Sequence, residues 1–223
     1  MDSPARAERG RKRYRGWPSL LFWTGPKHSG KTTAAAHLIA AARAEGLVVT
    51  GCLALSVYEM DRLVGFDLLD LQSNARLPLA RRQLKGPSIG RFHFLPEALK
   101  HGRGTLTQAA RQEVDLVVVD EYGPLELAHQ GWRSAVDTLI TATDTPLLLV
   151  VRQELIGQLR RLYATIPCMT LPAAEPQSIE EALGTLRTIR SARKSEIRKL
   201  SRPGGVPVAV AIDSDRQVPN GST

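Results

Sequence analysis

Short apolar runs alternate with helix-forming segments along most of this chain. Runs typical of buried strands are found at 19–24, 47–55, 116–119, 147–151 and 168–171. Alanine-rich or amphipathic segments that favour helices are found at 32–45, 96–113, 131–142, 154–164 and from 178 through 190 toward 199. Strands that alternate with helices predict an α/β domain, with a parallel sheet covered by helices on both faces.

The region between the second and third of these strands has a different pattern. Residues 62–71 are apolar and strand-like, and residues 89–94 alternate as a half-buried strand does. The stretch 73–88 between them is polar and contains two prolines, which predicts a loop. Gly102 and Gly104 predict an interruption of the helix that follows.

The positive charge of the chain is concentrated at its two ends. The formal net charge is +8, from 30 Lys and Arg against 22 Asp and Glu. Most of this excess lies in 1–17 and 187–202, whereas 18–186 is close to neutral. We expect a basic disordered arm over 1–17, a folded domain over 18–186, and a basic helix extension with a disordered tail over 187–223. The basic ends are either contacts for a nucleic acid or an acidic partner, or solvated charged termini.

Composition excludes several classes of protein. Cys52 and Cys168 are too few for a disulfide framework or a cysteine-rich zinc site, which suits a reducing compartment. No apolar run approaches the ~20 residues of a membrane span. The apolar stretch 20–23 after the basic N-terminus is too short for a signal-peptide core. We therefore expect a cytoplasmic protein with no membrane partner, and the sequence does not indicate its oligomeric state.

The strongest motif is a phosphate-binding loop. Residues 25–32, Gly-Pro-Lys-His-Ser-Gly-Lys-Thr, match G-x-x-x-x-G-K-[ST], with an apolar strand before the loop and a helix former after it. The glycines let successive amides face a phosphate, and the helix N-terminus adds a positive dipole end. We expect Lys31 to bridge the β- and γ-phosphates, Thr32 to bind Mg²⁺ and Thr33 to reach the α-phosphate. The predicted nucleotide-binding residues are Gly25, Pro26, Lys27, His28, Ser29, Gly30, Lys31, Thr32 and Thr33.

A second motif, Asp120-Glu121, follows the apolar strand at 116–119. In phosphate-loop enzymes an aspartate at such a strand end supplies a carboxylate for Mg²⁺. Neighbouring side chains alternate in direction, so we expect one carboxylate at the metal and the other polarising the attacking water as general base. The two motifs together predict a Mg²⁺-dependent nucleoside-triphosphate-binding domain. Arg152, at the end of the strand 147–151, is a further candidate for contact with the γ-phosphate.

The segment around the second motif also carries a family resemblance. Residues 120–127, Asp-Glu-Tyr-Gly-Pro-Leu-Glu-Leu, resemble the signature D-E-[IY]-G-x-[ML]-E-[LF] of the small nucleoside-triphosphatases that include the cancer-related nucleoside-triphosphatase. Segments 51–59, 62–67 and 89–92 resemble further stretches of that family in the same order. The resemblance covers residues 18–173 or thereabouts, which is most of the predicted domain.

The resemblance implies a P-loop NTPase fold, with a RecA-like parallel sheet and a small antiparallel insertion. Another strand would separate the phosphate-loop strand from the Asp-Glu strand. The implied activity is hydrolysis of nucleoside triphosphates (ATP, GTP or others) to the diphosphate and phosphate. The resemblance assigns phosphate and metal binding to Lys31 and Thr32, metal assistance to Asp120 and water activation to Glu121. Glu126 becomes a weaker candidate that orients the loop.

The chain departs from the family pattern at the phosphate loop, where Lys27 and His28 replace the usual Pro and Gly. Two alternatives to a triphosphatase also stay open. A nucleotide or small-molecule kinase shares this loop, and the arginines between 76 and 91 would then form its lid. The loop is similar, too, to that of the GTP-binding adaptor proteins of molybdopterin-guanine dinucleotide synthesis, which makes a non-hydrolytic adaptor the other alternative.

Overall fold

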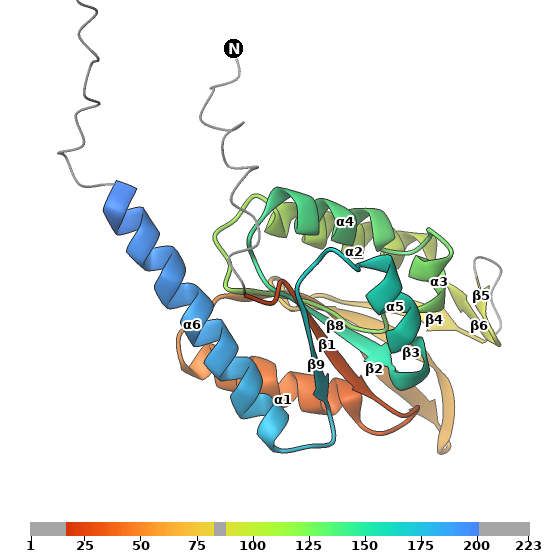
Figure 1. The fold of residues 1–223 in the computed structure, drawn as a ribbon. Coiled ribbons are helices and arrows are strands. Elements are labelled where there is room, and N and C mark those ends of the chain that lie inside the picture. The colour runs from red at the N-terminus through yellow and green to blue at the C-terminus, as the bar shows by residue number, and fades with distance from the viewer. Residues whose placement is uncertain (1–16, 83–87, 201–223) are drawn as a thin grey trace, which may run out of the picture.

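The apolar runs of the sequence pair side by side in one mixed sheet. A computed structural model describes residues 17–82 and 88–200 (Figure 1). The strands are β1 (Leu20–Gly25), β2 (Val49–Glu59), β3 (Arg62–Asp70), β4 (Arg76–Arg81), β5 (Ser88–Ile89), β6 (Phe92–Phe94), β7 (Leu116–Val119), β8 (Leu147–Arg152) and β9 (Cys168–Pro172). The helices are α1 (Lys31–Ala44), α2 (Pro96–Ala109), α3 (Pro124–Leu127), α4 (Arg133–Ala142), η3 (Gln153–Leu155), α5 (Ile156–Leu162) and α6 (Gln177–Leu200).

The strand order explains how the two motifs meet. The sheet runs β5-β6-β4-β3-β2-β7-β8-β1-β9, and the five strands from β2 to β9 in this order are parallel to one another. β8 therefore lies between β1, which leads into the phosphate loop, and β7, which leads into Asp120. This arrangement confirms the RecA-like order, and it brings both motifs to the carboxyl edge of the sheet.

Alternating side chains of the central strands feed two separate cores. Leu20 and Phe22 of β1 pack on one face of the sheet, with residues from α2, α4 and α5. Leu21 and Trp23 pack on the other face, with residues from α1 and α6. The same alternation continues through β7 and β8, so that these strands are apolar at every position except Arg152. The predicted parallel sheet with helices on both faces is confirmed.

The insertion contains a strand that the sequence pattern did not predict. β4 replaces part of the loop predicted over 73–88, and it pairs antiparallel with β3 and β6. Pro78 is accommodated because it lies at a register shift in the β3–β4 ladder, opposite Asp67. Asp67 also accepts hydrogen bonds from Arg76 and Arg81, which neutralise the charges of this strand. The loop prediction was therefore wrong over 76–81.

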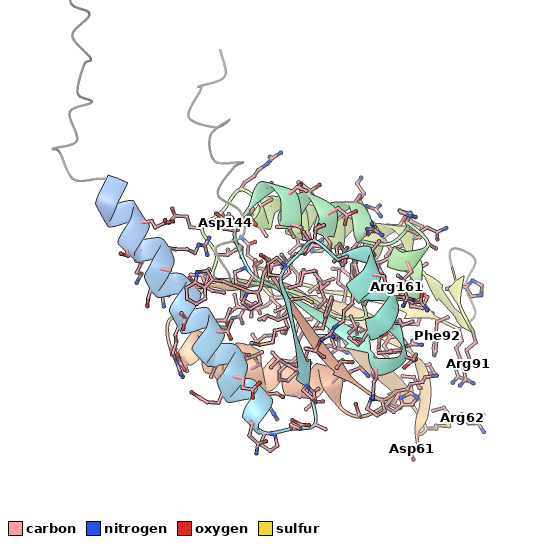
Figure 2. All side chains as sticks on the ribbon, viewed as in Figure 1. Asp61, Arg62, Arg91, Phe92, Asp144 and Arg161 are labelled. Carbon is pink, nitrogen blue, oxygen red and sulfur yellow. The ribbon has the colours of Figure 1, made fainter. Side chains whose placement is uncertain are left out.

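The β2–β3 hairpin projects past the site edge of the sheet. β2 continues from Ala54 to Glu59, a length of about 16 Å at the usual rise per residue. Met60 and Asp61 close the turn with positive φ angles of 43° and 60°. Figure 2 shows Asp61 at this tip, on the side of the molecule opposite Asp144, which precedes β8.

One helix differs from the sequence prediction. α2 runs unbroken through Gly102 and Gly104, so the predicted interruption was wrong. α6 is one continuous helix over Gln177–Leu200, which agrees with the helix predicted from 178 through 190 toward 199. Within the ranges that the structure describes, no helix is long and apolar enough to span a membrane. The predicted basic arm, apart from Trp17, and the predicted tail beyond residue 200 lie outside the described residues.

Candidate active site

The phosphate loop is a curled connection between β1 and α1. Gly30, directly before α1, has a positive φ of 78°, a conformation that favours glycine. Among the described residues, no side chain caps the N-terminus of α1, and its first turn has no acidic residue. The first amides of this helix therefore keep their capacity to donate hydrogen bonds to an anion.

Hydrogen bonds to neighbouring residues hold Lys31 at the end of the loop. Lys31 Nζ donates to the Pro26 carbonyl oxygen over 2.7 Å, and the Trp23 indole N–H donates to the Lys31 carbonyl oxygen over 3.1 Å. A Cβ atom on Gly25 would lie 2.7 Å from Ser29 Oγ, so the loop closes tightly at its start. Ser29 Oγ is buried and has no hydrogen-bond partner within the described part of the chain. A phosphate oxygen would satisfy this hydroxyl.

Asp120 is buried behind the loop, at the end of β7. Its Oδ2 accepts from the Ala54 amide over 3.0 Å, and its Oδ1 accepts from the Glu121 amide over 2.8 Å. Burial raises the pKa of Asp120 to about 7, helped by the charge of Glu121, whereas hydrogen bonds from Ala54, Thr32 and Glu121 act in the opposite direction. The Thr32 hydroxyl thus lies beside the Asp120 carboxylate, as two groups around one cation would.

Glu121 is the more exposed carboxylate of the pair. Its backbone has a positive φ of 55°, which non-glycine residues rarely adopt. Its Oε2 lies 3.6 Å from Nη2 of Arg152, at the end of β8. Arg152 is in register with Gly25 of β1, the first residue of the phosphate loop. The structure therefore brings Arg152 to the site, between the loop and Glu121.

The electrostatics of Lys31 reflect this convergence. Burial lowers the pKa of Lys31, while the charges of Glu121 and Asp120 raise it and that of Arg152 lowers it further. These four charged groups therefore interact electrostatically across the carboxyl edge of the sheet. The charge of Glu154 raises the pKa of Lys31 as well. Acidic and basic side chains thus face one another there, an arrangement able to bind a polyanion together with a divalent cation.

Glu126 lies behind the site and fixes the segment that follows Glu121. Its Oε2 accepts from the Gly123 amide over 2.8 Å, and its Oε1 accepts from the Trp132 amide over 3.1 Å. Burial raises the pKa of Glu126 to about 7, against the effect of the hydrogen bonds from both amides. Gly131 has no space for a side chain, since a Cβ atom there would lie 2.1 Å from Glu126 Oε1.

The residues present fit a Mg²⁺ ion. Mg²⁺ in nucleotide sites is usually held by one or two protein oxygens, substrate phosphates and water. The Thr32 hydroxyl and the Asp120 carboxylate supply such oxygens next to the loop, where the two groups are hydrogen-bonded to each other. The donor set consists of hard oxygens only, which suits Mg²⁺ better than a softer metal.

Comparison with known proteins agrees with this geometry. The family model described as NTPase matches residues 20–170. The chain belongs to this NTPase family. Curated relatives include the nucleoside-triphosphatase THEP1 of Methanopyrus kandleri, 32% identical over 139 residues, which are 61% of this chain and 75% of that protein. THEP1 of Caldivirga maquilingensis is 28% identical over 178 residues, which are 76% of this chain and 95% of that protein.

Solved structures of similar proteins support the NTPase fold. The solution structure of a human cancer-related nucleoside triphosphatase has a TM-score of 0.56 at 22% identity, over 84% of this chain and 100% of that chain. The crystal structure of THEP1 from Aquifex aeolicus has a TM-score of 0.57 at 16% identity, over 75% of this chain and 97% of that chain.

Sequence reasoning missed two parts of this NTPase site. The sequence predicts Trp23 only as an apolar strand residue, yet its indole fixes the start of α1. The Ala54 amide was missed as well, because nothing in the sequence shows which strand lies beside β7. The sequence does carry one sign of this role. Trp23 lies near a strand end, and a buried indole N–H needs a hydrogen-bond acceptor.

The structure also shows what the arginines of the predicted kinase lid and of α6 contact. Arg76 and Arg81 pair with Asp67, and the Arg82 guanidinium lies over the Phe92 ring, so three arginines of the predicted kinase lid have partners within the insertion. In α6, three arginines contact other parts of the domain: Arg187, although exposed, pairs with Glu45, Arg190 pairs with Asp115, and Arg193 donates to the Val114 carbonyl.

Proposed function

We propose that this protein hydrolyses nucleoside triphosphates to the diphosphate and phosphate, with Mg²⁺ at Thr32 and Asp120. The observation that carries the proposal is the meeting of the phosphate loop, Asp120 and Glu121 at one edge of the sheet. The names of the two curated relatives described above, both nucleoside-triphosphatase THEP1, support the reaction class. A water molecule is the acceptor, because Glu121 stands beside Asp120 with its carboxylate partly exposed.

The residues of the loop bind and orient the triphosphate. Lys31 exchanges the Pro26 carbonyl for oxygens of the β- and γ-phosphates, and Thr33 lies in the first turn of α1, toward the α-phosphate. The Ser29 hydroxyl gains a phosphate oxygen as the partner that it lacks within the described residues. Lys27 and His28 are exposed on the loop, where they add positive charge or a proton donor around the phosphates. Mg²⁺, when bound, neutralises charge that develops on the phosphate oxygens.

Glu121 takes the proton of the attacking water. The water oxygen forms a bond to the γ-phosphorus as the bond to the β–γ bridging oxygen breaks, and the diphosphate keeps that electron pair. Arg152 releases Glu121 and contacts the γ-phosphate, which leaves the carboxylate available to the water. Glu126 does not touch substrate in this scheme; it positions the loop behind Glu121.

We place this activity in the cytoplasm, where the free Cys52 and Cys168 stay reduced. The partner that binds at this site is the nucleotide. A nucleic acid or acidic partner at the basic termini would have to use residues other than Arg187, Arg190 and Arg193, which contact the domain.

The test is phosphate release from ATP, GTP, CTP and UTP with Mg²⁺ and no added acceptor. We expect steady release by the wild type, loss of release with EDTA, and a fall of about 10²-fold or more in Glu121→Gln with nucleotide binding retained. Glu113→Gln is the matched control, because Glu113 is an exposed acid before β7, at the other edge of the sheet. Wild-type rates in Glu121→Gln would remove Glu121 as the base, and nucleotide binding without release would favour a kinase or an adaptor.

A further inference from the structure

A polar network that is buried at Tyr122 and Tyr163 and partly exposed at Asp137 lies behind the Asp-Glu pair. The hydroxyl groups of Tyr122 and Tyr163 are 2.5 Å apart, and the Tyr163 hydroxyl donates to Asp137 Oδ1 over 3.1 Å. Asp137 Oδ2 accepts from Arg133 Nε over 2.7 Å. Because a phenol has a single proton, and Tyr163 gives its proton to Asp137, Tyr122 is the donor to Tyr163. The network thus links the segment after β7 to the end of α5 and to α4.

Packing alone does not require these hydroxyl groups. Tyr122 is 1% exposed and Tyr163 is 6% exposed, so phenylalanine at either position would bury nearly the same apolar ring. Burial raises the pKa of both hydroxyls, which keeps them protonated and able to donate. A buried hydroxyl pair fixes the direction of both rings, because any rotation breaks a hydrogen bond that no water can replace.

The direction of the Glu121 side chain depends on the residues on either side of it. The Glu121 amide donates to Asp120, and the Tyr122 amide donates to the Val150 carbonyl over 3.1 Å. The positive φ of Glu121 is a strained conformation that persists only where the surroundings impose it. Rotation of the backbone at Glu121 would swing the Tyr122 ring, which the Tyr163 hydroxyl holds in place.

We propose that Tyr163 is a positioning residue for Glu121, acting through its hydroxyl bond to Tyr122. This inference rests on the proposed role of Glu121 as the general base. Tyr163 follows α5, far from the phosphate loop in sequence, and it does not touch the reacting atoms. Its role is to keep the Glu121 carboxylate in the direction of the attacking water before the nucleotide arrives.

A cycle of four proteins tests this role: wild type, Tyr163→Phe, Glu121→Gln and the double variant. Tyr163→Phe removes only the hydroxyl. Because small displacements of a catalytic group are costly, we expect kcat for phosphate release to fall about tenfold, with KM and the affinity for a non-hydrolysable triphosphate unchanged. In the Glu121→Gln background the same substitution is expected to leave kcat unchanged, since there is no base left to position.

Two further variants separate positioning from loss of stability. Thr145→Val removes a buried hydroxyl that donates to the Val114 carbonyl and accepts from Arg193. Thr145 follows Asp144, which Figure 2 shows on the side opposite the hairpin tip. We expect Thr145→Val to lower the melting temperature without changing kcat. Tyr122→Phe removes the same hydroxyl pair but keeps the bond from Tyr163 to Asp137, so it reports on the pair if Tyr163→Phe does not fold.

The outcomes are distinct for the two proposals. A fall in kcat that is confined to proteins with Glu121 supports the positioning role. Unchanged kcat in folded Tyr163→Phe or Tyr122→Phe overturns it, as does an equal fall in the Glu121→Gln background. Wild-type turnover in the Glu121→Gln protein instead rejects the proposed function, whatever the tyrosine variants do.

Discussion

Two residues of the site have backbone conformations that their side chains disfavour. His28 has φ 62° and Glu121 has φ 55°, and each such residue costs of order 1–3 kcal/mol. His28 lies in the phosphate loop, and Glu121 lies across from it, next to Arg152. These two conformations therefore lower the stability of the fold, and they hold the phosphate loop and Glu121 in a fixed shape. Such a preformed site is what electrostatic stabilisation of a phosphoryl-transfer transition state requires.

At this scale the clearest prediction concerns Arg152. Its Nη2 lies 3.6 Å from Glu121 Oε2, which is long for an ion pair. A γ-phosphate, which carries more charge, would therefore displace the carboxylate. Arg152→Ala is expected to weaken binding of a non-hydrolysable triphosphate about tenfold and to leave diphosphate binding nearly unchanged. Titration with both nucleotides measures this, with Arg111→Ala, an exposed arginine before β7, as control. An equal loss for both nucleotides would contradict a γ-phosphate contact.

Among the elements, α2 shows how tertiary packing overrides a local rule. The two glycines at 102 and 104 predict a break, yet the helix continues because Gly102 packs against the Trp132 indole. A Cβ atom at Gly102 would lie 2.7 Å from Trp132 Nε1, whereas a Cβ atom at Gly104 meets nothing within 4 Å. One glycine is required by packing, and the other only weakens the helix.

These two glycines make a matched pair for measurement. Gly104→Ala is expected to raise the free energy of unfolding by about 0.5–1 kcal/mol, because alanine favours the helix. Gly102→Ala is expected to lower it by about 1–3 kcal/mol, because the indole must move. Denaturant unfolding of both variants checks the signs. Stabilisation by both substitutions would show that the Trp132 side chain yields without strain.

The difference between local sequence preference and tertiary packing also explains which elements could be predicted from the sequence. β7 and β8 were placed within a residue because burial on both faces makes them apolar at nearly every position. β4 was missed because its stability depends on partners elsewhere, Asp67 for its arginines and a ladder irregularity for Pro78. In the site, contiguous motifs were visible, whereas Trp23 and Tyr163 act through contacts that only the fold creates.

For the whole molecule, α6 joins regions that are far apart along the chain. In its middle, Arg187 contacts Glu45 at the end of α1. Further along, Arg193 donates to the Val114 carbonyl and to Thr145, beside the amino ends of β7 and β8. Arg187 and Arg193 therefore act as contacts that dock this helix on the domain.

Removal of one of these contacts should loosen the helix without affecting catalysis. Arg193→Ala is expected to lower the free energy of local opening of α6 by about 1 kcal/mol, because two hydrogen bonds are lost. Hydrogen exchange of the α6 amides measures this opening. Lys194→Ala is the control, since Lys194 is exposed. Equal exchange in the two variants, or loss of phosphate release in Arg193→Ala alone, would contradict this docking role.

The place of β1 in the sheet has a consequence for how the protein is made. β1 pairs with β8 and β9, both synthesised more than a hundred residues later. Until the ribosome has released residue 152, the strand Leu-Leu-Phe-Trp has neither neighbour, and β8 does not yet lie beside the phosphate loop. Chains that stop earlier carry an apolar, unpaired strand near their start, which favours aggregation. Nucleotide binding can therefore appear only late in translation, after β8 has been inserted between β7 and β1.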